Sequence, residues 1–258
     1  MLKLVKTELW KLKRYSVIWI GVAATLSVVL LTWFMTVAAD GSEHTLKNLS
    51  NNVIWNNFTL IYPATITLIA GYTMERERTD DTLKNLMSLP ISFRRLLVGK
   101  LLTSGLIAVL LALIEFVFTL GVFFISGYPG FSPSIAVRSL IQMIGMNLCV
   151  YVVVLPIIIF TGQREGTFMA GVAFAFFYGF VGTFASGHGL TSLYPISAGL
   201  GLINYQGDGA VGIINKSVCL IVILLMAVFS AIMIFHSHDR VKKQKAAPYH
   251  KQTAGKRM

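Results

Sequence analysis

The sequence predicts an all-α, polytopic membrane protein with six transmembrane helices. Hydrophobic residues make up 55% of its 258 residues and charged residues only 13%, whereas a soluble domain carries about 25% charged residues. Six apolar runs are also long enough to cross a bilayer, which takes about 20 residues. The composition therefore excludes a soluble globular domain, a disordered chain, a coiled coil and a disulfide-stapled scaffold.

The expected spans lie in six runs that are almost free of charge. Five of them contain no Asp, Glu, Lys or Arg, and the third contains one acid, Glu115. Each run should be a helix, because an open strand would leave backbone polar groups without partners in lipid. No linker divides the chain, so residues 1–258 should form a single transmembrane domain. The runs are 17–39, 53–74, 101–126, 139–161, 166–187 and 217–235.

The basic residues predict how the spans are oriented. Nineteen of the 22 Lys and Arg residues lie on one side, and the other side carries Lys47, Arg138 and Lys216. Because cytoplasmic connections carry the excess of Lys and Arg, both termini should be cytoplasmic in a multi-pass protein of the cell membrane. Orientation thus explains the formal charge of +11 without nucleic-acid binding. The basic segments are 1–16, 75–100, 162–165 and the tail 236–258.

Residues 1–16 are expected to form an interfacial helix. Apolar side chains recur there at helical spacing, with Trp10 beside them, while the cations lie largely on other sides of the helix. Such a helix turns its apolar side to the lipid and its lysines to anionic headgroups. The alternative is a plain basic flank of the first span. The apolar positions are Leu2, Val5, Leu9 and Leu12, and the cationic ones are Lys3, Lys6, Lys13 and Arg14.

The segment 75–100 predicts a short helix beside the membrane. Thr79 or Asp80 is a suitable N-cap, Pro90 ends the helix, and Ser92 can cap the next one. An apolar stripe on a helix outside the bilayer needs a partner. That partner is either the spans of the same chain or another protein. The stripe consists of Leu83, Leu86 and Met87.

Several steps in this segment resemble one known family. The pattern resembles the cytoplasmic loop of type-2 ATP-binding-cassette (ABC) exporter permeases, in which an acid ends the second span and a Thr-Leu step opens the coupling helix. The six spans, the amphipathic N-terminal helix and the chain length are similar too. In its size and in the Leu-Pro-Ile-Ser step, the chain looks most like the permeases of lantibiotic and bacitracin immunity exporters. The steps are Glu75 and Glu77, Thr82-Leu83, Leu89-Pro90-Ile91-Ser92 and Gly99-Lys100.

The resemblance implies partners that the residues alone do not reveal. It implies two ABC ATPase subunits that grip the segment 75–100, and a second permease chain, identical or homologous. ATP and Mg²⁺ would be bound by the ATPase, with no cofactor in this chain. The residues that it assigns to ATPase coupling are Glu75, Glu77, Thr82, Leu83, Leu86, Met87, Leu89 and Pro90.

Motifs for chemistry are missing from the sequence. A P-loop needs Ser or Thr after Gly-Lys, but Leu101 follows Gly99-Lys100 and Arg257 follows Gly255-Lys256. There is no HExxH, no GxSxG and no Cys/His cluster, so we expect no catalytic residue and no metal site. The prediction is a transporter subunit without its own ATPase site.

Polar residues inside the spans leave alternatives open. Glu115 must face protein or water, or be protonated, because a charge in the bilayer centre is costly. Gln142 and Asn147 of the fourth span are its candidate polar partners. A proton-coupled secondary transporter using Glu115 is therefore an alternative to an exporter of amphipathic or hydrophobic cargo such as a peptide antibiotic. The nearly uncharged segment 188–212 should dip back into the bilayer from the outer side. His188 and Asp208 in it are expected to be turn residues.

Overall fold

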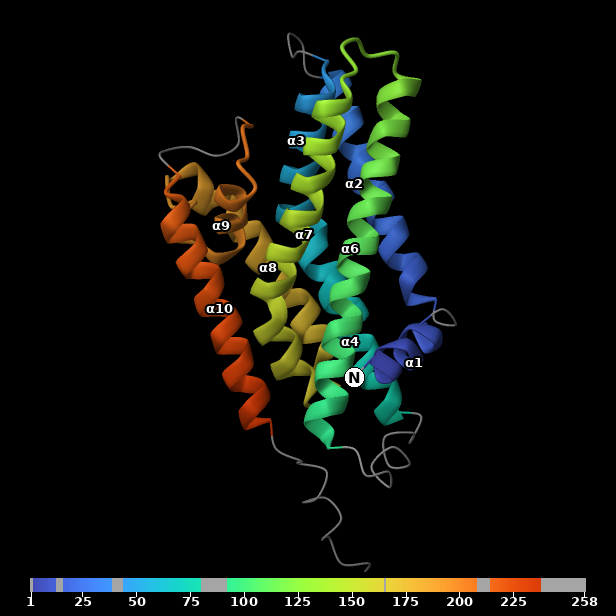
Figure 1. The fold of residues 1–258 in the computed structure, drawn as a ribbon, viewed down its shortest axis with the longest axis vertical. Coiled ribbons are helices and arrows are strands. Elements are labelled where there is room, and N and C mark those ends of the chain that lie inside the picture. Colours follow the sequence, from blue (N-terminus) through green and yellow to red (C-terminus); the bar gives the residue numbers. More distant parts are fainter. Residues whose placement is uncertain are drawn as a thin grey trace, which may run out of the picture.

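The protein is a bundle of helices. The computed structural model describes residues 2–12, 16–38, 44–79, 92–164, 166–207 and 214–237, and no strand occurs among them. Figure 1 shows long helices running side by side along the longest axis, with the short helix α1 (Leu2–Leu12) lying across one end. The predicted all-α fold is therefore confirmed for the described part of the chain.

All six predicted spans are present among the described residues. The structure extends the second span in both directions and begins the third at Phe93, about two turns before its apolar run. These helices are longer than their apolar runs because a helix can continue beyond the hydrocarbon layer, where its polar side chains reach water. The spans are α2 (Val17–Ala38), a composite second span (Leu46–Glu77), α6 (Phe93–Ile125), α7 (Pro133–Gly162), α8 (Phe168–Gly187) and α10 (Lys216–His236).

The second span is interrupted by a π-helix. It consists of α3 (Leu46–Asn56), η1 (Asn57–Ile61) and α4 (Tyr62–Thr79), and the backbone N–H of Tyr62 donates to the carbonyl of Asn57. Pro63 explains the interruption, because it has no N–H to donate and its ring clashes with the carbonyl one turn earlier. The wider turn relieves that clash inside an otherwise continuous helix.

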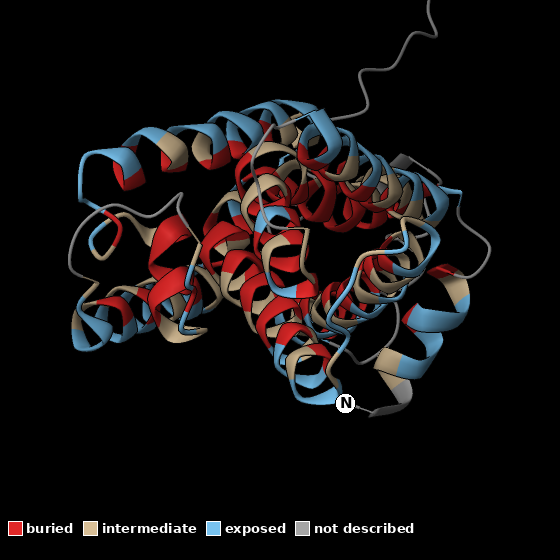
Figure 2. Cartoon of the chain, turned by 90° about the horizontal axis from the view of Figure 1, so that it is seen from above, coloured by how far each residue is buried: buried red, intermediate tan, exposed pale blue. Residues whose placement is uncertain are grey.

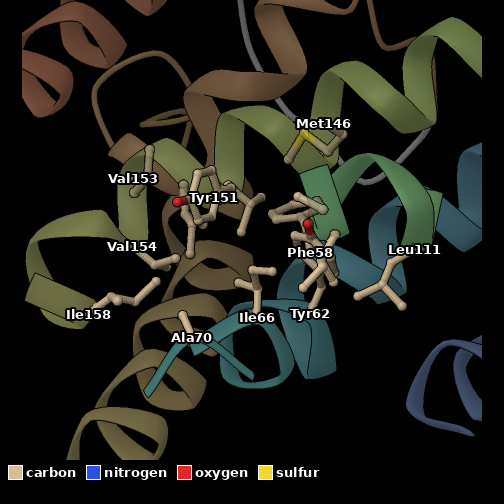
Figure 3. Close-up of a cluster of buried hydrophobic side chains, with 14 of the residues drawn as sticks. Phe58, Tyr62, Ile66, Ala70, Leu111, Met146, Tyr151, Val153, Val154 and Ile158 are labelled. Carbon is tan, nitrogen blue, oxygen red and sulfur yellow. The ribbon is translucent and has the colours of Figure 1, made fainter. Parts of the chain in front are cut away.

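The core lies around the second and fourth spans. The most apolar part of Leu46–Glu77 is 67% buried, whereas that of α10 is only 17% buried. Figure 2 shows the buried residues gathered at the centre of the bundle and the exposed ones on the outer helices. Side chains from α4 and α7 interlock in this core, among them Ile66, Val154 and Ile158 (Figure 3). The exposed apolar surface of the outer helices matches lipid rather than water.

The described parts of the predicted basic segments lie at one end of the bundle. Helix α1 and the lower ends of α4, α6 and α10 share this end, and the start of α3 and the α6–α7 connection lie at the other (Figure 1). We call the first the α1 end. This arrangement agrees with the charge bias, and the cytoplasmic orientation of the α1 end stays a prediction. The tail after Ser237 lies outside the described residues.

Two sequence predictions concern helix ends. Helix α4 continues through Thr79, so of the two predicted N-cap candidates, Thr79 and Asp80, Thr79 is the last residue of the preceding span. Ser92 does stand at the N-cap of α6, but its side chain makes no capping hydrogen bond. Asp80 and Pro90 lie outside the described residues.

The predicted apolar face of the N-terminal helix is also partly wrong. Trp10 is 72% exposed and Leu9 is exposed too, as expected of a lipid-facing side, but Leu12 is buried against the protein. Glu8 is buried with it, one turn earlier. Helix α1 therefore has a second face, which packs on the bundle and includes an acid.

The segment after α8 forms a short helix inside the bundle. Helix α9 (Pro195–Leu202) packs against α7, α8 and α10, and its residues from Ile196 to Gly201 are buried. This placement suits the predicted re-entrant segment 188–212, whose depth in a bilayer stays a prediction. His188 ends α8, where its ring Nδ1 lies 2.9 Å from the carbonyl of Phe184, so it is a turn residue as expected. Asp208 lies outside the described residues.

Candidate functional site at the α1 end

Four charged side chains form a closed cluster at the α1 end. Glu8 and Lys11 come from α1, Glu77 from the end of α4 and Lys100 from the start of α6. Lys11 Nζ lies 2.9 Å from Glu8 Oε1 and 2.8 Å from Glu77 Oε1. Lys100 Nζ lies 3.0 Å from Glu8 Oε2 and 2.9 Å from Glu77 Oε1. Each lysine thus bridges the same two glutamates, and we call these four residues the ion cluster.

The two lysines of the ion cluster differ in how far their side chains are buried. The Lys100 side chain is 6% exposed and the Lys11 side chain is 33% exposed. An ammonium group has three N–H donors, and Lys100 has three acceptors, because the carbonyl of Thr73 lies 3.2 Å away in addition to the two carboxylates. Lys100 is therefore the buried centre of the cluster, and Lys11 lies at its more exposed edge.

The cluster shifts the pKa values of its α1 members. Burial raises the pKa of Glu8, but the charges and hydrogen bonds of Lys100 and Lys11 outweigh it and hold this pKa below the ordinary 4.5. Burial likewise lowers the pKa of Lys11, but hydrogen bonds to Glu77 and Glu8 raise it above the ordinary 10.5. Both groups therefore stay charged at neutral pH, as a closed set of two positive and two negative charges requires.

Packing beside the cluster brings α1 close to α6. A Cβ at Gly99 would collide with the Leu4 side chain, so glycine at this position allows the contact. Leu4, Glu8 and Leu12 are four residues apart and lie on one side of α1. The Gly99-Lys100 step therefore has two local roles: Gly99 admits Leu4, and Lys100 binds the carboxylate of Glu8.

The other acid at the end of α4 holds a different part of the bundle. Glu75 Oε1 accepts a hydrogen bond of 2.9 Å from the backbone N–H of Gly166 in the α7–α8 turn. Gly166 has a φ of +70°, a conformation that favours glycine. Glu75 and Glu77 thus point to different neighbours, and the end of α4 is fixed to the α7–α8 turn as well as to α1 and α6.

Most of the residues that the resemblance assigns to ATPase coupling lie outside the described residues. Only Glu75 and Glu77 are described, and both make contacts within the chain. The structure does bring the two ends of the segment 75–100 together, because Glu77 near its start and Lys100 at its end form an ion pair. The residues outside are Thr82, Leu83, Leu86, Met87, Leu89 and Pro90.

The two candidate partners of Glu115 are separated by the fold. Asn147 Nδ2 donates to Glu115 Oε2 at 3.1 Å, as predicted. Gln142 Nε2 instead donates to the carbonyls of Ile203 and Asn204, at 3.0 and 3.2 Å, and so anchors the end of α9. Gln142 and Asn147 are five residues apart in α7, which turns them about 140° from one another around the helix, so one side chain faces α6 and the other faces α9.

Sequence reasoning missed Glu8 and Asn57. Glu8 is the one acid in a basic amphipathic helix, and that exception was the signal that could have marked it. Asn57 stands inside an apolar run six residues before Pro63. It donates to Asn147 Oδ1 at 3.3 Å and so joins the Glu115 contact.

Comparison with known proteins identifies the family. A family model described as ABC-2 family transporter protein matches residues 4–182, more than two thirds of the chain. The chain belongs to this family. It is thus a multi-pass membrane component of an ABC transporter, a family whose members work with an ABC ATPase subunit. A comparison with curated proteins finds no match.

The part of this ABC-2 family protein that matches includes the candidate site. The matched residues run from α1 to α8 and contain all four members of the ion cluster, together with Asn57, Glu115 and Asn147. Helices α9 and α10 follow the match. The ion cluster and the contacts of Glu115 therefore lie in the part of the chain that the family model matches.

Proposed function

We propose that the chain is the permease subunit of an ABC exporter. In this proposal, two copies of a separate ATPase subunit bind ATP and Mg²⁺, and a second permease chain, identical or homologous, completes the transport path. The α1 end faces the cytoplasm, where the ATPase docks. The cargo is an amphipathic or hydrophobic molecule, such as a peptide antibiotic.

The observation that carries this proposal is the ion cluster. It ties the end of α4 and the start of α6 to one another and to α1, and the segment between these ends is the one that resembles an ATPase-coupling loop. A partner that moves this segment must therefore move α4, α6 and α1 together. Glu75 extends the same motion to the α7–α8 turn.

The proposed mechanism converts that motion into export. Closure of the ATPase subunits on ATP pushes the segment 80–91 and tilts α4 and α6, which opens the seam between the two permease chains. The apolar character of the exposed and buried surfaces supports the proposed cargo class. Large apolar side chains such as Phe34, Phe177 and Leu225 are exposed on α2, α8 and α10, and the intramembrane acid Glu115 is fully buried.

Two replacements in the stripe test the docking role. The double change Leu83→Asp with Leu86→Asp should abolish co-purification of an ABC ATPase with the tagged chain, or uncouple ATP hydrolysis from export, while membrane insertion stays intact. Mild-detergent purification followed by mass spectrometry and an ATPase assay measures both effects. Ser134→Asp, an exposed position at the opposite end of the bundle, is the matched control and should leave the complex intact.

Two results would overturn the proposal. One is movement of cargo by the reconstituted chain without a nucleotide-hydrolysing partner, driven by a pH gradient alone. The other is labelling of a cysteine introduced at position 84 by a membrane-impermeant reagent added outside intact cells. The first result would favour a secondary transporter, and the second would reverse the orientation.

A further inference from the structure

Four polar side chains meet inside the bundle, away from the ion cluster. Asn57 of η1, Tyr62 of α4, Glu115 of α6 and Asn147 of α7 are each at most 3% exposed. Asn57 donates to Asn147, and Asn147 donates to Glu115 Oε2. Asn57 also interacts with the Glu115 carboxyl. Three transmembrane elements therefore deliver polar groups to one carboxyl group.

The π-helix places Asn57 and Tyr62 in this group together. The hydrogen bond from the Tyr62 N–H to the Asn57 carbonyl spans five residues, so both residues lie on the same side of the segment. In an α-helix, residues five apart would be turned about 140° from one another. The π-helix is therefore a local feature that assembles the site, as π-bulges often do at functional positions.

Two atoms of the group have no hydrogen-bond partner in the described structure. They are Glu115 Oε1 and the Tyr62 hydroxyl oxygen, both buried, and the two side chains lie close enough to interact electrostatically. Figure 3 shows Tyr62 among buried apolar side chains, beside Phe58 and Ile66. An unpaired buried polar atom is costly, and here two of them belong to side chains that interact with one another.

The neighbours of Glu115 do not neutralise an ionised carboxylate. Asn147 from α7 and Asn57 from η1 are uncharged, and the titratable groups near the site are Tyr62 from α4 and, next to it, Tyr151 from α7. Among the described residues, the salt bridges formed by Lys11 and Lys100 at the α1 end do not include Glu115. An ionised carboxylate in the interior of a membrane bundle without a cation is strongly disfavoured.

We propose that Glu115 is an intramembrane proton-binding site that is occupied in this packing. The proton sits on Oε1, is directed toward the Tyr62 hydroxyl oxygen, and is exchanged with water only when α4, α6 and α7 separate. Oε2 stays bound to Asn147. The ligand is the proton alone, taken up from water by the carboxylate to give the neutral acid. This inference does not rest on the proposed function.

Infrared spectroscopy of the full chain in lipid nanodiscs tests the site. At neutral pH the wild-type protein should show the carbonyl band of a protonated carboxylic acid, and Glu115→Gln should remove that band. Tyr62→Phe should shift its frequency, because it removes the hydroxyl dipole that interacts with the Glu115 carboxyl group. If Glu115→Gln removes intensity from the carboxylate bands instead, Glu115 is ionised and the proposal is wrong. An unshifted band in Tyr62→Phe removes Tyr62 from the site.

Control variants keep this test decisive. Glu75→Gln makes the same chemical change at an acid outside the bundle interior, bound to Gly166, and should leave the acid band unchanged. Loss of the band in Glu75→Gln would contradict the assignment. Where Glu115→Gln does not fold, Glu115→Asp keeps an acid and should shift the band in a folded protein. An unshifted band in that variant would also overturn the proposal.

Discussion

Glu77 and Lys100 form an ion pair of 2.9 Å in which both side chains are at most 6% exposed. Glu77 lies near the start of the segment 75–100, which resembles an ATPase-coupling loop, and Lys100 is its last residue, so the pair joins the two ends of that segment. Glu8 of α1 binds the same lysine. This relationship makes the α1 end one mechanical unit, and the first three predictions concern it.

The two lysines of the ion cluster should contribute very differently to stability. Lys100→Ala leaves two buried glutamates without their central cation, a loss of about 3–5 kcal/mol for a broken buried pair. Lys11→Ala removes a partly exposed lysine and should cost about 0.2–1 kcal/mol. Thermal unfolding in detergent compares the two variants. Equal losses would mean that Lys100 is not the centre of the cluster.

The attachment of α1 should depend on pH only at the extremes. The pKa of Glu8 is lowered in the folded protein, so its stabilisation is complete above the ordinary value of 4.5 and is lost as the pH falls through the folded value. The pKa of Lys11 is raised, so its contribution is complete below the ordinary value of 10.5 and is lost as the pH rises through the folded value. Between these limits α1 should stay bound.

A spin label at position 6 measures this attachment, because Lys6 is exposed on α1. Its mobility should rise only below pH 4.5 on the acid side. In Glu8→Gln the label should already be mobile at neutral pH, and acid should add little. A midpoint between pH 6 and pH 7 would point to a histidine and would contradict the role given to Glu8.

Gly99 should be sensitive to substitution while Gly121 in the same helix is not. A methyl group at Gly99 meets Leu4, whereas one at Gly121 meets nothing within 4 Å. Gly99→Ala should therefore loosen α1, and the additional change Leu4→Ala should restore its attachment by making room. Gly121→Ala should be neutral or stabilise by up to about 1 kcal/mol. The label mobility described above and thermal unfolding report both effects, and failure of the rescue would refute the contact.

Gly179 of α8 should be required for packing on the π-helix. A Cβ there would lie 3.0 Å from the carbonyl oxygen of Thr59, 3.1 Å from that of Phe58 and 2.9 Å from Pro63. Because two of these atoms are backbone, Gly179→Ala should destabilise by about 1–3 kcal/mol. Gly187→Ala, with nothing within 4 Å, is the control in the same helix. Unfolding temperatures that match would show that α8 can move away from η1.

The spans were predictable because each is an independent consequence of hydropathy. A run such as 139–161 must cross the bilayer as a helix whatever its neighbours do. The apolar face of α1 was only partly predictable, since Leu12 faces the protein and Leu9 does not. A helical wheel finds amphipathic sides, but it cannot say which of them meets lipid and which meets another helix.

Contacts between helices could not be predicted in the same way. Gln142 and Asn147 are both polar residues of one apolar run, and only the rotation of α7 in the bundle decides that Asn147 meets Glu115. Glu8 could be noticed as an acid in a basic helix, but its partner Lys100 is 92 residues away. Such pairs depend on how distant helices pack, which a single sequence does not state.

By itself, the sequence determined an all-helical membrane protein, the number and place of its spans, the grouping of its cations, and the resemblance to ABC-2 permeases. These properties depend on local hydropathy, charge and motif, which each stretch of chain carries independently. Only the tertiary structure decided that Glu8, Lys11, Glu77 and Lys100 close into one cluster and that the π-helix turns Asn57 toward Asn147. The reason is that a buried charge or amide needs a polar partner, and only the packing of distant helices brings such partners within hydrogen-bond distance.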